Sequence, residues 1–313
     1  MELVDSRVLV TGGAGFVGSH LAERLATDNT VTVVDDLSNG RKEWIPKTAE
    51  FVEVDLSNET AVNSVVSSQF DIVFHCAARN DPNDDDPRGQ FEANTGMTYN
   101  LLSACRSAGI ERFVYTSSST VYGEAPRPTP EDYAPLEPIS IYGASKLADE
   151  GLISTYAHSH GLEAFVLRFA NVIGPRLRGA VIPDFIEKLR SDSDTLEILG
   201  NGRQEKSYIH VSDCIGAMCH VVEQASSAAP ERSLHTFNLG TKTTTSVDTI
   251  ADIVSDVLDL NPCYEYSGGD RGWTGDVPRM RLSTQKLSAL GWTAHLESTD
   301  AVEQATKELV NEL

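Results

Sequence analysis

The sequence has few positively charged residues: 25 lysines and arginines stand against 46 aspartates and glutamates, and the formal net charge is −21. A field of this sign repels nucleic acid and anionic membrane surfaces, so we expect neither as a partner. Lysine is especially scarce and aspartate abundant. This pattern indicates either adaptation to a salt-rich cytoplasm or an ordinary acidic cytoplasmic enzyme.

Long apolar runs and paired cysteines are also missing. No stretch of about 18 apolar residues is present, which argues against a membrane span. No charged and then apolar leader precedes the first expected strand, so we expect no signal peptide and a cytoplasmic location. The five cysteines contain no C-x-x-C pair, which favours buried reduced thiols and no metal site.

What is present is an alternation of apolar, strand-like runs with helical patterns. Strands separated by helices form parallel sheets with right-handed crossovers, so we predict an α/β fold with a doubly wound parallel sheet, the Rossmann fold. The expected strands are Arg7–Thr11, Thr30–Val34, Glu50–Val54, Asp71–Cys76, Arg112–Ser117 and Ala164–Phe169, and the expected helices cover about residues 15–27, 59–68, 89–109 and 142–160.

The pattern changes after Gly174–Pro175, where shorter elements are separated by glycine-containing turns. We therefore predict a dinucleotide-binding domain over residues 1–174. Residues 175–313 would form mainly a smaller substrate-binding lobe, with a segment at about 207–240 returning to the first domain.

A glycine-rich segment, Thr11–Gly18, follows the first expected strand and opens a helix. Its glycines permit a tight turn and close approach of the backbone to a pyrophosphate, which the helix N-terminus attracts. Asp35 ends the second strand, 17 residues beyond Gly18. A carboxylate there accepts both ribose hydroxyls of adenosine and repels a 2′-phosphate, so the sequence predicts NAD rather than NADP.

Tyr142 and Lys146 are four residues apart and therefore share one helix face. A free phenol titrates near ~10, and a nearby ammonium together with an oxidised nicotinamide favours the phenolate, so we expect a lowered Tyr142 pKa. Ser118 follows the fifth strand, at the sheet edge where ligands bind in such folds. We predict these three residues as the catalytic set.

These motifs resemble the extended short-chain dehydrogenases/reductases, and most closely their UDP-glucose 4-epimerase group. The similarity runs from Thr11–Gly18 through Arg168–Pro175 and Gly275–Val277 to Leu290–Trp292. It implies NAD-dependent 4-epimerisation of a UDP-hexose such as UDP-glucose through a 4-keto sugar, with Tyr142 as the base. Alternatives are UDP-N-acetylglucosamine or UDP-glucuronate 4-epimerisation and, in another class, a non-catalytic NAD-sensing protein, which would typically lack the tyrosine or lysine.

Related dehydratases and decarboxylases of this family carry acidic residues just before the Val-Tyr-Gly segment. Here Ser119 and Thr120 stand at those positions, so the acid or base needed for elimination is missing and epimerisation is favoured. The resemblance also implies a homodimer formed through the helices at about 89–109 and 142–160.

The resemblance assigns site residues one by one. The implied cofactor contacts are Gly12, Gly15, Phe16, Val17, Gly18, Asp35, Asp36, Leu37, Ser38, Asn39, Gly40, Asp55, Leu56, Ala77, Ala78, Asn94, Ser117, Tyr142 and Lys146. The implied substrate contacts are Ser118, Asn171, Val181, Lys206, Arg271, Asp276 and Arg279. The family usually has arginine at the positions of Lys206 and Trp273, so Arg271 or Arg279 would supply the missing guanidinium. Met280 lies where the family controls pocket size.

Overall fold

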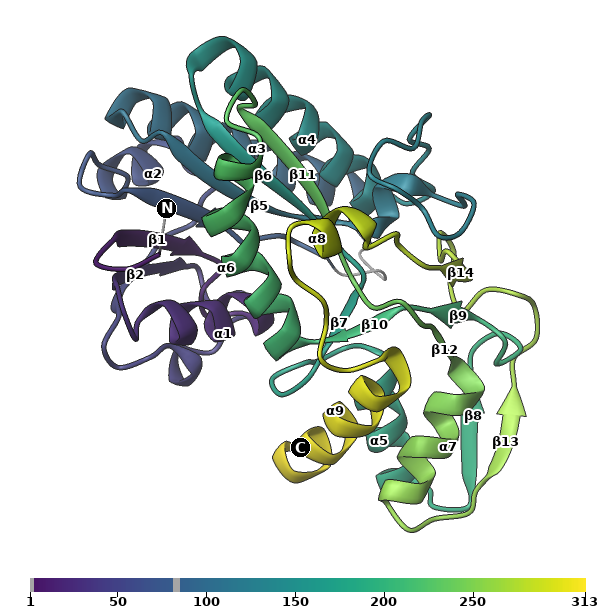
Figure 1. Cartoon of the computed structure of the whole chain (residues 1–313). Helices are drawn as coiled ribbons and strands as arrows, with labels where there is room; N and C mark the ends of the chain where they lie inside the picture. Colours follow the sequence, from purple (N-terminus) through teal and green to yellow (C-terminus); the bar gives the residue numbers. More distant parts are fainter. Residues whose placement is uncertain (1–2, 81–84) are drawn as a thin grey trace.

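The computed structural model describes residues 3–80 and 85–313, and one large sheet dominates the first half of the chain (Figure 1). Its parallel strands stand in the order β11-β6-β5-β4-β1-β2-β3. They are β1 (Arg7–Thr11), β2 (Thr30–Asp35), β3 (Glu50–Glu53), β4 (Ile72–His75), β5 (Arg112–Ser118), β6 (Glu163–Phe169) and β11 (Leu234–Leu239). The predicted doubly wound parallel sheet is confirmed. Its strand order reverses between β1 and β4, and ligands bind at such a point, beyond the carboxyl ends of the strands.

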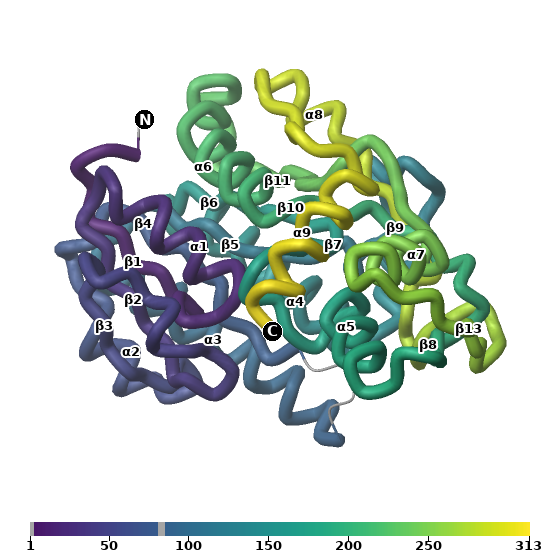
Figure 2. The backbone as a smooth tube through the Cα atoms, turned by 90° about the horizontal axis from the view of Figure 1, so that it is seen from below, coloured from purple at the N-terminus to yellow at the C-terminus, as the bar shows by residue number. Residues whose placement is uncertain are grey.

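The strands feed two apolar cores, because successive side chains of a strand point to opposite faces of the sheet. Val8 and Val10 of β1 pack in one core with α1 and α6, whereas Leu9 packs in the other with α2, α3 and α4. The helices are α1 (Phe16–Leu25), α2 (Glu59–Val65), α3 (Pro87–Ala108), α4 (Ile141–His160) and α6 (Val211–Ala228). The sheet therefore lies between two helical layers, with α6 on one side and α2 and α3 on the other in Figure 2.

The two longest helices begin and end at capping residues. Asp86 accepts a hydrogen bond from Gly89 N at the start of α3, and Ser140 accepts one from Gly143 N at the start of α4. Gly109 and Gly161 end these helices in the left-handed conformation that glycine adopts without strain. The cap at Ser140 fixes where the first turn of α4 begins.

A third core lies in the C-terminal half, where Phe185, Ile250 and Leu309 pack together from three helices. These are α5 (Val181–Ser191), α7 (Val247–Val257) and α9 (Ser298–Glu312), beside the paired strands β8 (Thr195–Ile198) and β13 (Cys263–Tyr266). Figure 1 shows this group below the large sheet. The domain boundary at residue 174 stays a prediction, although α6 and β11 do lie on the large sheet.

The remaining elements of the described chain are short. They are η1 (Lys42–Trp44), η2 (Ser119–Tyr122), β7 (Asn171–Ile173), β9 (Glu205–Lys206), β10 (Tyr208–His210), β12 (Thr245–Ser246), β14 (Arg279–Met280) and α8 (Gln285–Ala289). β7 pairs with β10, and β9 lies between β12 and β14. Among the described residues, no helix is both long and apolar enough to cross a membrane.

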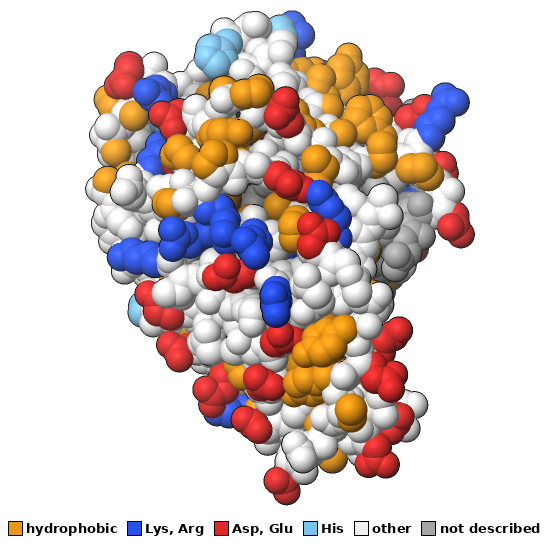
Figure 3. All heavy atoms as spheres, turned by 90° about the vertical axis from the view of Figure 1, so that its right-hand side faces the viewer, with side chains coloured by type: hydrophobic (Ala, Val, Ile, Leu, Met, Phe, Trp, Pro, Cys, Tyr) orange, Lys and Arg blue, Asp and Glu red, His pale blue; other side chains and the backbone are white. Residues whose placement is uncertain are grey.

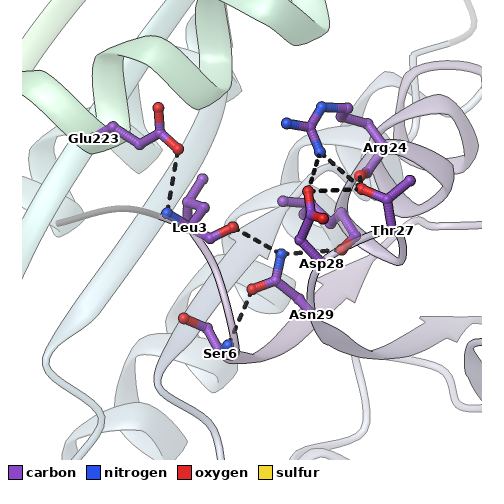
Figure 4. A network of polar contacts seen from close by, with 8 residues as sticks. Leu3, Ser6, Arg24, Thr27, Asp28, Asn29 and Glu223 are labelled. Atoms are coloured by element: carbon purple, nitrogen blue, oxygen red, sulfur yellow. Dashed lines mark hydrogen bonds and ion pairs between the residues drawn. The ribbon is translucent and has the colours of Figure 1, made fainter.

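Polar contacts fix the entry of the chain into β1 (Figure 4). The Asn29 side chain donates to the carbonyl oxygens of Leu3 and Leu25, at 3.0 Å each, and accepts from Ser6 N at 3.0 Å. Leu3 N donates to the Glu223 carboxylate on α6. The first strand is thereby held in line with the turn between α1 and β2.

Candidate active site

The turn between β1 and α1 is built for close backbone approach. Gly12 has φ +66°, and a Cβ there would lie 2.5 Å from Ala77 N at the end of β4. A Cβ on Gly18 would lie 2.1 Å from Gly12 O. Gly15 is the N-cap of α1 and gives the helix no side-chain cap. The first amides of α1 therefore have no side-chain cap, and the predicted pyrophosphate site at this turn stays a prediction.

Asp35 stands beside this turn at the end of β2. Its carboxylate is buried and accepts hydrogen bonds from Leu37 N at 2.8 Å and Ala14 N at 3.0 Å. Burial raises the pKa of Asp35, and those two hydrogen bonds oppose the shift. A Cβ on Gly40 would lie 2.8 Å from Asp35 Oδ1, so the following loop packs closely against the carboxylate.

The other predicted cofactor residues lie around this edge of the sheet. Asp36, Ser38, Asn39 and Asp55 are exposed in the loops after β2 and β3, and Leu56 is buried. Phe16 and Val17 open α1, and Ala77 and Ala78 follow β4; all four are partly buried.

Two predicted cofactor residues have their polar groups engaged with the protein. The Asn94 amide accepts from Arg79 N and donates to Arg79 O and Ser145 Oγ, all within 3.0 Å. The Ser117 hydroxyl donates to Glu150 at 2.6 Å. In this structure both side chains position neighbouring segments.

The three predicted catalytic residues lie on α4 and on the end of β5, two elements that pack together. Lys146 is buried; its Nζ donates to Thr116 O at 2.8 Å and lies 5.6 Å from the Tyr142 ring centroid. Ser118 ends β5, and its Oγ accepts from the amide and the hydroxyl of Thr120. The Ser118 proton therefore stays available to a ligand.

Burial shifts the pKa of both groups on α4. It lowers the pKa of Lys146 to about 8, against the opposing effect of the Asp149 charge. It raises the pKa of Tyr142, and Asp149 adds to that rise. The expected lowering of the Tyr142 pKa needs Lys146 together with an oxidised nicotinamide, so it stays a prediction for the NAD-loaded protein; in the protein alone, burial raises this pKa.

Beneath the predicted catalytic residues lies a buried polar network that the sequence did not predict. Arg168 of β6 binds both carboxylate oxygens of Glu150 on α4, at 3.0 and 2.6 Å. The same guanidinium donates to Tyr122 Oη at 2.8 Å, and Tyr122 donates to Asn238 of β11 at 2.8 Å. A sequence signal existed, since Glu150 follows Lys146 by four residues and so lies on the same helix face.

Three of the predicted substrate residues lie together. Lys206 Nζ forms an ion pair with the buried Asp276 carboxylate, and Arg271 donates to Asp276 O and pairs with Glu124. Gly272 N also donates to Asp276, at 3.0 Å. This cluster joins β9 to the loop before β14.

Arg279 lies apart from this cluster. In the pairing of β14 with β9, Arg279 stands beside Glu205 and Met280 beside Lys206. Since successive side chains alternate, Arg279 shares the Glu205 face, where Arg127 also binds that carboxylate at 3.3 Å. Of the two arginine candidates, the structure brings Arg271 alone to Lys206 and Asp276.

The last two predicted substrate residues open their elements: Asn171 begins β7, and partly buried Val181 begins α5. The face that carries β9 and β14 shows Lys and Arg side chains gathered across its middle, above a lower part rich in acidic side chains (Figure 3). Cations are concentrated there although the chain is acidic as a whole.

Comparison with known proteins gives concordant matches. The chain matches the NAD dependent epimerase/dehydratase family over residues 8–240. A putative UDP-glucose 4-epimerase of Methanocaldococcus jannaschii is 30% identical over 312 residues, covering 97% of this chain and 98% of that protein. A crystal structure of a UDP-galactose 4-epimerase matches with a TM-score of 0.90 and 38% identity, covering 98% of this chain and 99% of that one. The structure of the UDP-N-acetylglucosamine 4-epimerase of Methanobrevibacter ruminantium, in complex with UDP-N-acetylmuramic acid, matches with a TM-score of 0.86 and 26% identity. The match covers 99% of this chain and 100% of that one.

Proposed function

This chain belongs to the NAD-dependent epimerase/dehydratase family, and from that premise we propose that it interconverts UDP-glucose and UDP-galactose by epimerisation at C4. The observation that supports the proposal is the bond of Lys146 to Thr116 O, two residues before Ser118 on β5, with Tyr142 one turn before Lys146 on α4, together with a glycine turn that fits a dinucleotide. The cofactor of the family is NAD.

The residues that would hold NAD are those of the cradle: the turn Gly12–Gly18 for the pyrophosphate and Asp35 for the adenosine ribose. When bound, oxidised NAD would supply a reversible hydride acceptor and a positive charge that favours the Tyr142 phenolate. The turn fits the group because any side chain at Gly12 or Gly18 would meet the backbone of the cradle itself.

In the proposed mechanism Tyr142 takes the proton of the sugar 4-hydroxyl, and the C4 hydrogen leaves with its electron pair, giving a 4-keto sugar. Ser118 donates a hydrogen bond to the reacting oxygen. Lys146 keeps a positive charge near the phenolate, and its bond to Thr116 O holds it there. After the sugar turns, Tyr142 returns the proton while the hydride returns to the opposite face of C4.

The end of β5 supports epimerisation over elimination. Positions 119 and 120 carry hydroxyl groups and no carboxylate. Ser119 is buried, and the Thr120 hydroxyl donates to Ser118. The nearby acidic groups on α4 are Glu150, which Arg168 binds, and Asp149, which accepts a hydrogen bond from Tyr115. A proton removed from the sugar at C4 therefore has Tyr142 as its acceptor.

We further propose that the substrate diphosphate binds Lys206 and Arg271. Their present partners, Asp276 and Glu124, are carboxylates that a diphosphate would replace. Release from Lys206 would free the Asp276 carboxylate for a ribose hydroxyl of the nucleotide.

Asp35→Asn is expected to lower NAD affinity by about 10- to 100-fold, because two charge-assisted bonds to ribose become neutral ones. Discrimination against NADP should fall as well, since the repelling charge is gone. Calorimetric titration of each cofactor measures both effects, with Asp28→Asn, an exposed carboxylate at the other end of β2, as the control. Unchanged NAD and NADP affinities would contradict the assigned role of Asp35.

The substrate is tested by incubating the purified protein, without added NAD, with UDP-glucose, UDP-N-acetylglucosamine and UDP-glucuronate in separate reactions. We expect UDP-galactose from the first. Met280 shares the Lys206 face and has a flexible side chain, so UDP-N-acetylgalactosamine from the second would identify the N-acetyl sugar as a second substrate. Formation of none of the three C4 epimers would sink the proposal.

We also propose a cytoplasmic homodimer that pairs α3 and α4 of two copies. Tyr99 on α3 is 52% exposed, and a Cβ at Gly96 or Gly151 would meet no atom within 4 Å, so this surface has room for a partner helix. The five cysteines are all free, which agrees with a reducing compartment.

Tyr99→Glu is expected to shift the protein from dimer to monomer, because it places a charge at the proposed interface of an already acidic chain. Sedimentation velocity measures the shift. Tyr266→Glu, a substitution of similar exposure on β13, should leave the dimer intact. A monomeric wild-type protein would rule the interface out.

A further inference from the structure

We propose that Asp149 and Tyr115 form a buried pair of positioning residues that sets, from one turn beyond Lys146, the pH range in which Tyr142 and Lys146 act. The inference rests on the proposed epimerase function, because it concerns the same catalytic groups. It assigns a role to two residues that touch neither the substrate nor the cofactor in the proposed mechanism.

The ring of Tyr115 links Asp149 to Lys146, and Lys146 in turn lies beside the ring of Tyr142. Tyr115 Oη donates to Asp149 Oδ2 at 2.5 Å, and the centroid of the same ring lies 4.6 Å from Lys146 Nζ. Asp149 is only 1% exposed and follows Lys146 by three residues on α4, on the same face of the helix. Charge on the Asp149 carboxylate is therefore poorly screened from the Lys146 ammonium.

The groups on neighbouring elements do not neutralise the charge of the Asp149 carboxylate. At the end of β4, burial lowers the pKa of His75 to about 3, and it raises the pKa of Cys76, the next residue, to about 12, so both are neutral near pH 7. On α3, Thr98 offers an uncharged hydroxyl. On α4, the charge of Glu150 is matched by Arg168. Among the described residues, no arginine, lysine or histidine forms such an ion pair with Asp149.

The Asp149 carboxylate can also change its charge within the working range. Burial raises its pKa to about 6, while Lys146 and the hydroxyls of Tyr115 and Thr98 lower it. It is therefore ionised at neutral pH and loses its charge under mild acid. The ionised form raises the pKa of Lys146 and that of Tyr142 alike.

The charge of Asp149 therefore shifts the pKa values of Lys146 and Tyr142 in the same direction. In the NAD-loaded enzyme, where the positive charge of the cofactor favours the phenolate, Tyr142 is needed as phenolate and sets the acid limb of the pH profile, whereas Lys146 is needed as ammonium and sets the alkaline limb. Removing the Asp149 charge lowers both pKa values. The whole profile should then move to lower pH, instead of losing height at a fixed position.

The test is the pH profile of kcat/KM for Asp149→Asn, in which the amide oxygen can still accept from Tyr115. We expect both limbs to move to lower pH by about one unit. Tyr115→Phe removes the donor that favours the carboxylate, so its profile should move in the same direction by a smaller amount. The double variant should match Asp149→Asn, because the Tyr115 hydroxyl acts through Asp149. A lower rate at every pH with unmoved limbs would overturn the proposal.

Asp213→Asn is the matched control. Asp213 is also a buried carboxylate, on α6, and is hydrogen-bonded to His295 far along the chain; its replacement should leave both limbs in place. A shift of the same size in this variant would show a general effect of removing negative charge and would overturn the assignment to Asp149.

A second readout needs no sugar turnover. Near-ultraviolet absorbance of tyrosinate follows the Tyr142 titration in the NAD-loaded protein, after subtraction of the same titration in a Tyr142→Phe background. We expect the Tyr142 titration to begin at lower pH in Asp149→Asn. If that shift is present while no UDP-sugar is epimerised, the proposed function is wrong, and the role of Asp149 and Tyr115 as positioning residues is supported. If epimers form and the Tyr142 titration does not move, only the role of Asp149 and Tyr115 is wrong.

Discussion

Tyr142→Phe is expected to lower kcat by about 10²- to 10⁴-fold, the usual contribution of a positioned general base. The ring stays in place beside Lys146, but the oxygen that accepts the 4-hydroxyl proton is gone. The variant should keep its bound NAD, since the cradle of Gly12, Gly18 and Asp35 lies on other elements. Conversion of UDP-glucose and the NAD content of the purified protein are the two measurements.

The control for this variant is Tyr266→Phe, which removes a hydroxyl from an exposed tyrosine of β13. It should leave the rate within a factor of about two, as expected for a surface substitution. Full activity of Tyr142→Phe would remove Tyr142 from the mechanism. Loss of NAD together with activity would assign it to cofactor binding instead.

Arg168→Ala should be the most destabilising single substitution, at about 3–5 kcal/mol, because it leaves the buried Glu150 charge without its partner. The guanidinium also satisfies Tyr122 Oη and Glu131 O, which would lose a donor. Urea unfolding followed by circular dichroism measures the change. Activity should fall with stability, since Glu150 lies one turn beyond Lys146 and holds Ser117 in place.

Two further variants separate the charge from the packing. Arg24→Ala removes an exposed arginine paired with Asp28 on the surface and should cost about 0–1 kcal/mol. Arg168→Met combined with Glu150→Met removes both buried charges and should recover much of the loss. Equal destabilisation by Arg24→Ala and Arg168→Ala would show that the buried pair has no special weight.

The sequence predicts the large sheet well because its strands are continuous apolar runs. β1 matches its predicted limits, and β2, β5 and β6 differ by a single residue. The strand β11 was not predicted as such, since His235, Thr236 and Asn238 interrupt its apolar character. Polar residues can be buried in this strand because distant segments supply their hydrogen-bond partners. The Asn238 amide, for example, donates to Thr129 O and Ser283 O.

The proximity of Tyr142 and Lys146 on α4 could be predicted, because one local spacing in the sequence determines it. The sequence did not predict those positions of side chains that depend on pairing between distant segments. The register of β14 against β9 separates Arg279 from Lys206, and no local spacing in the sequence contains that register. Likewise the pKa of Tyr142 depends on how deeply β5 and α4 bury the phenol, which the neighbouring lysine does not show.

The path of the chain also limits how this protein can be divided or recombined. β11 is the edge strand beside β6, yet it is reached only after the chain has formed α5 and β8 in the other half. A fragment that stops near residue 174 would leave the β6 edge unpaired and one face of the sheet without α6, a state prone to aggregation. Exchange of everything after residue 174 would therefore replace β11 and α6 of the large sheet together with the elements around β9 and β14.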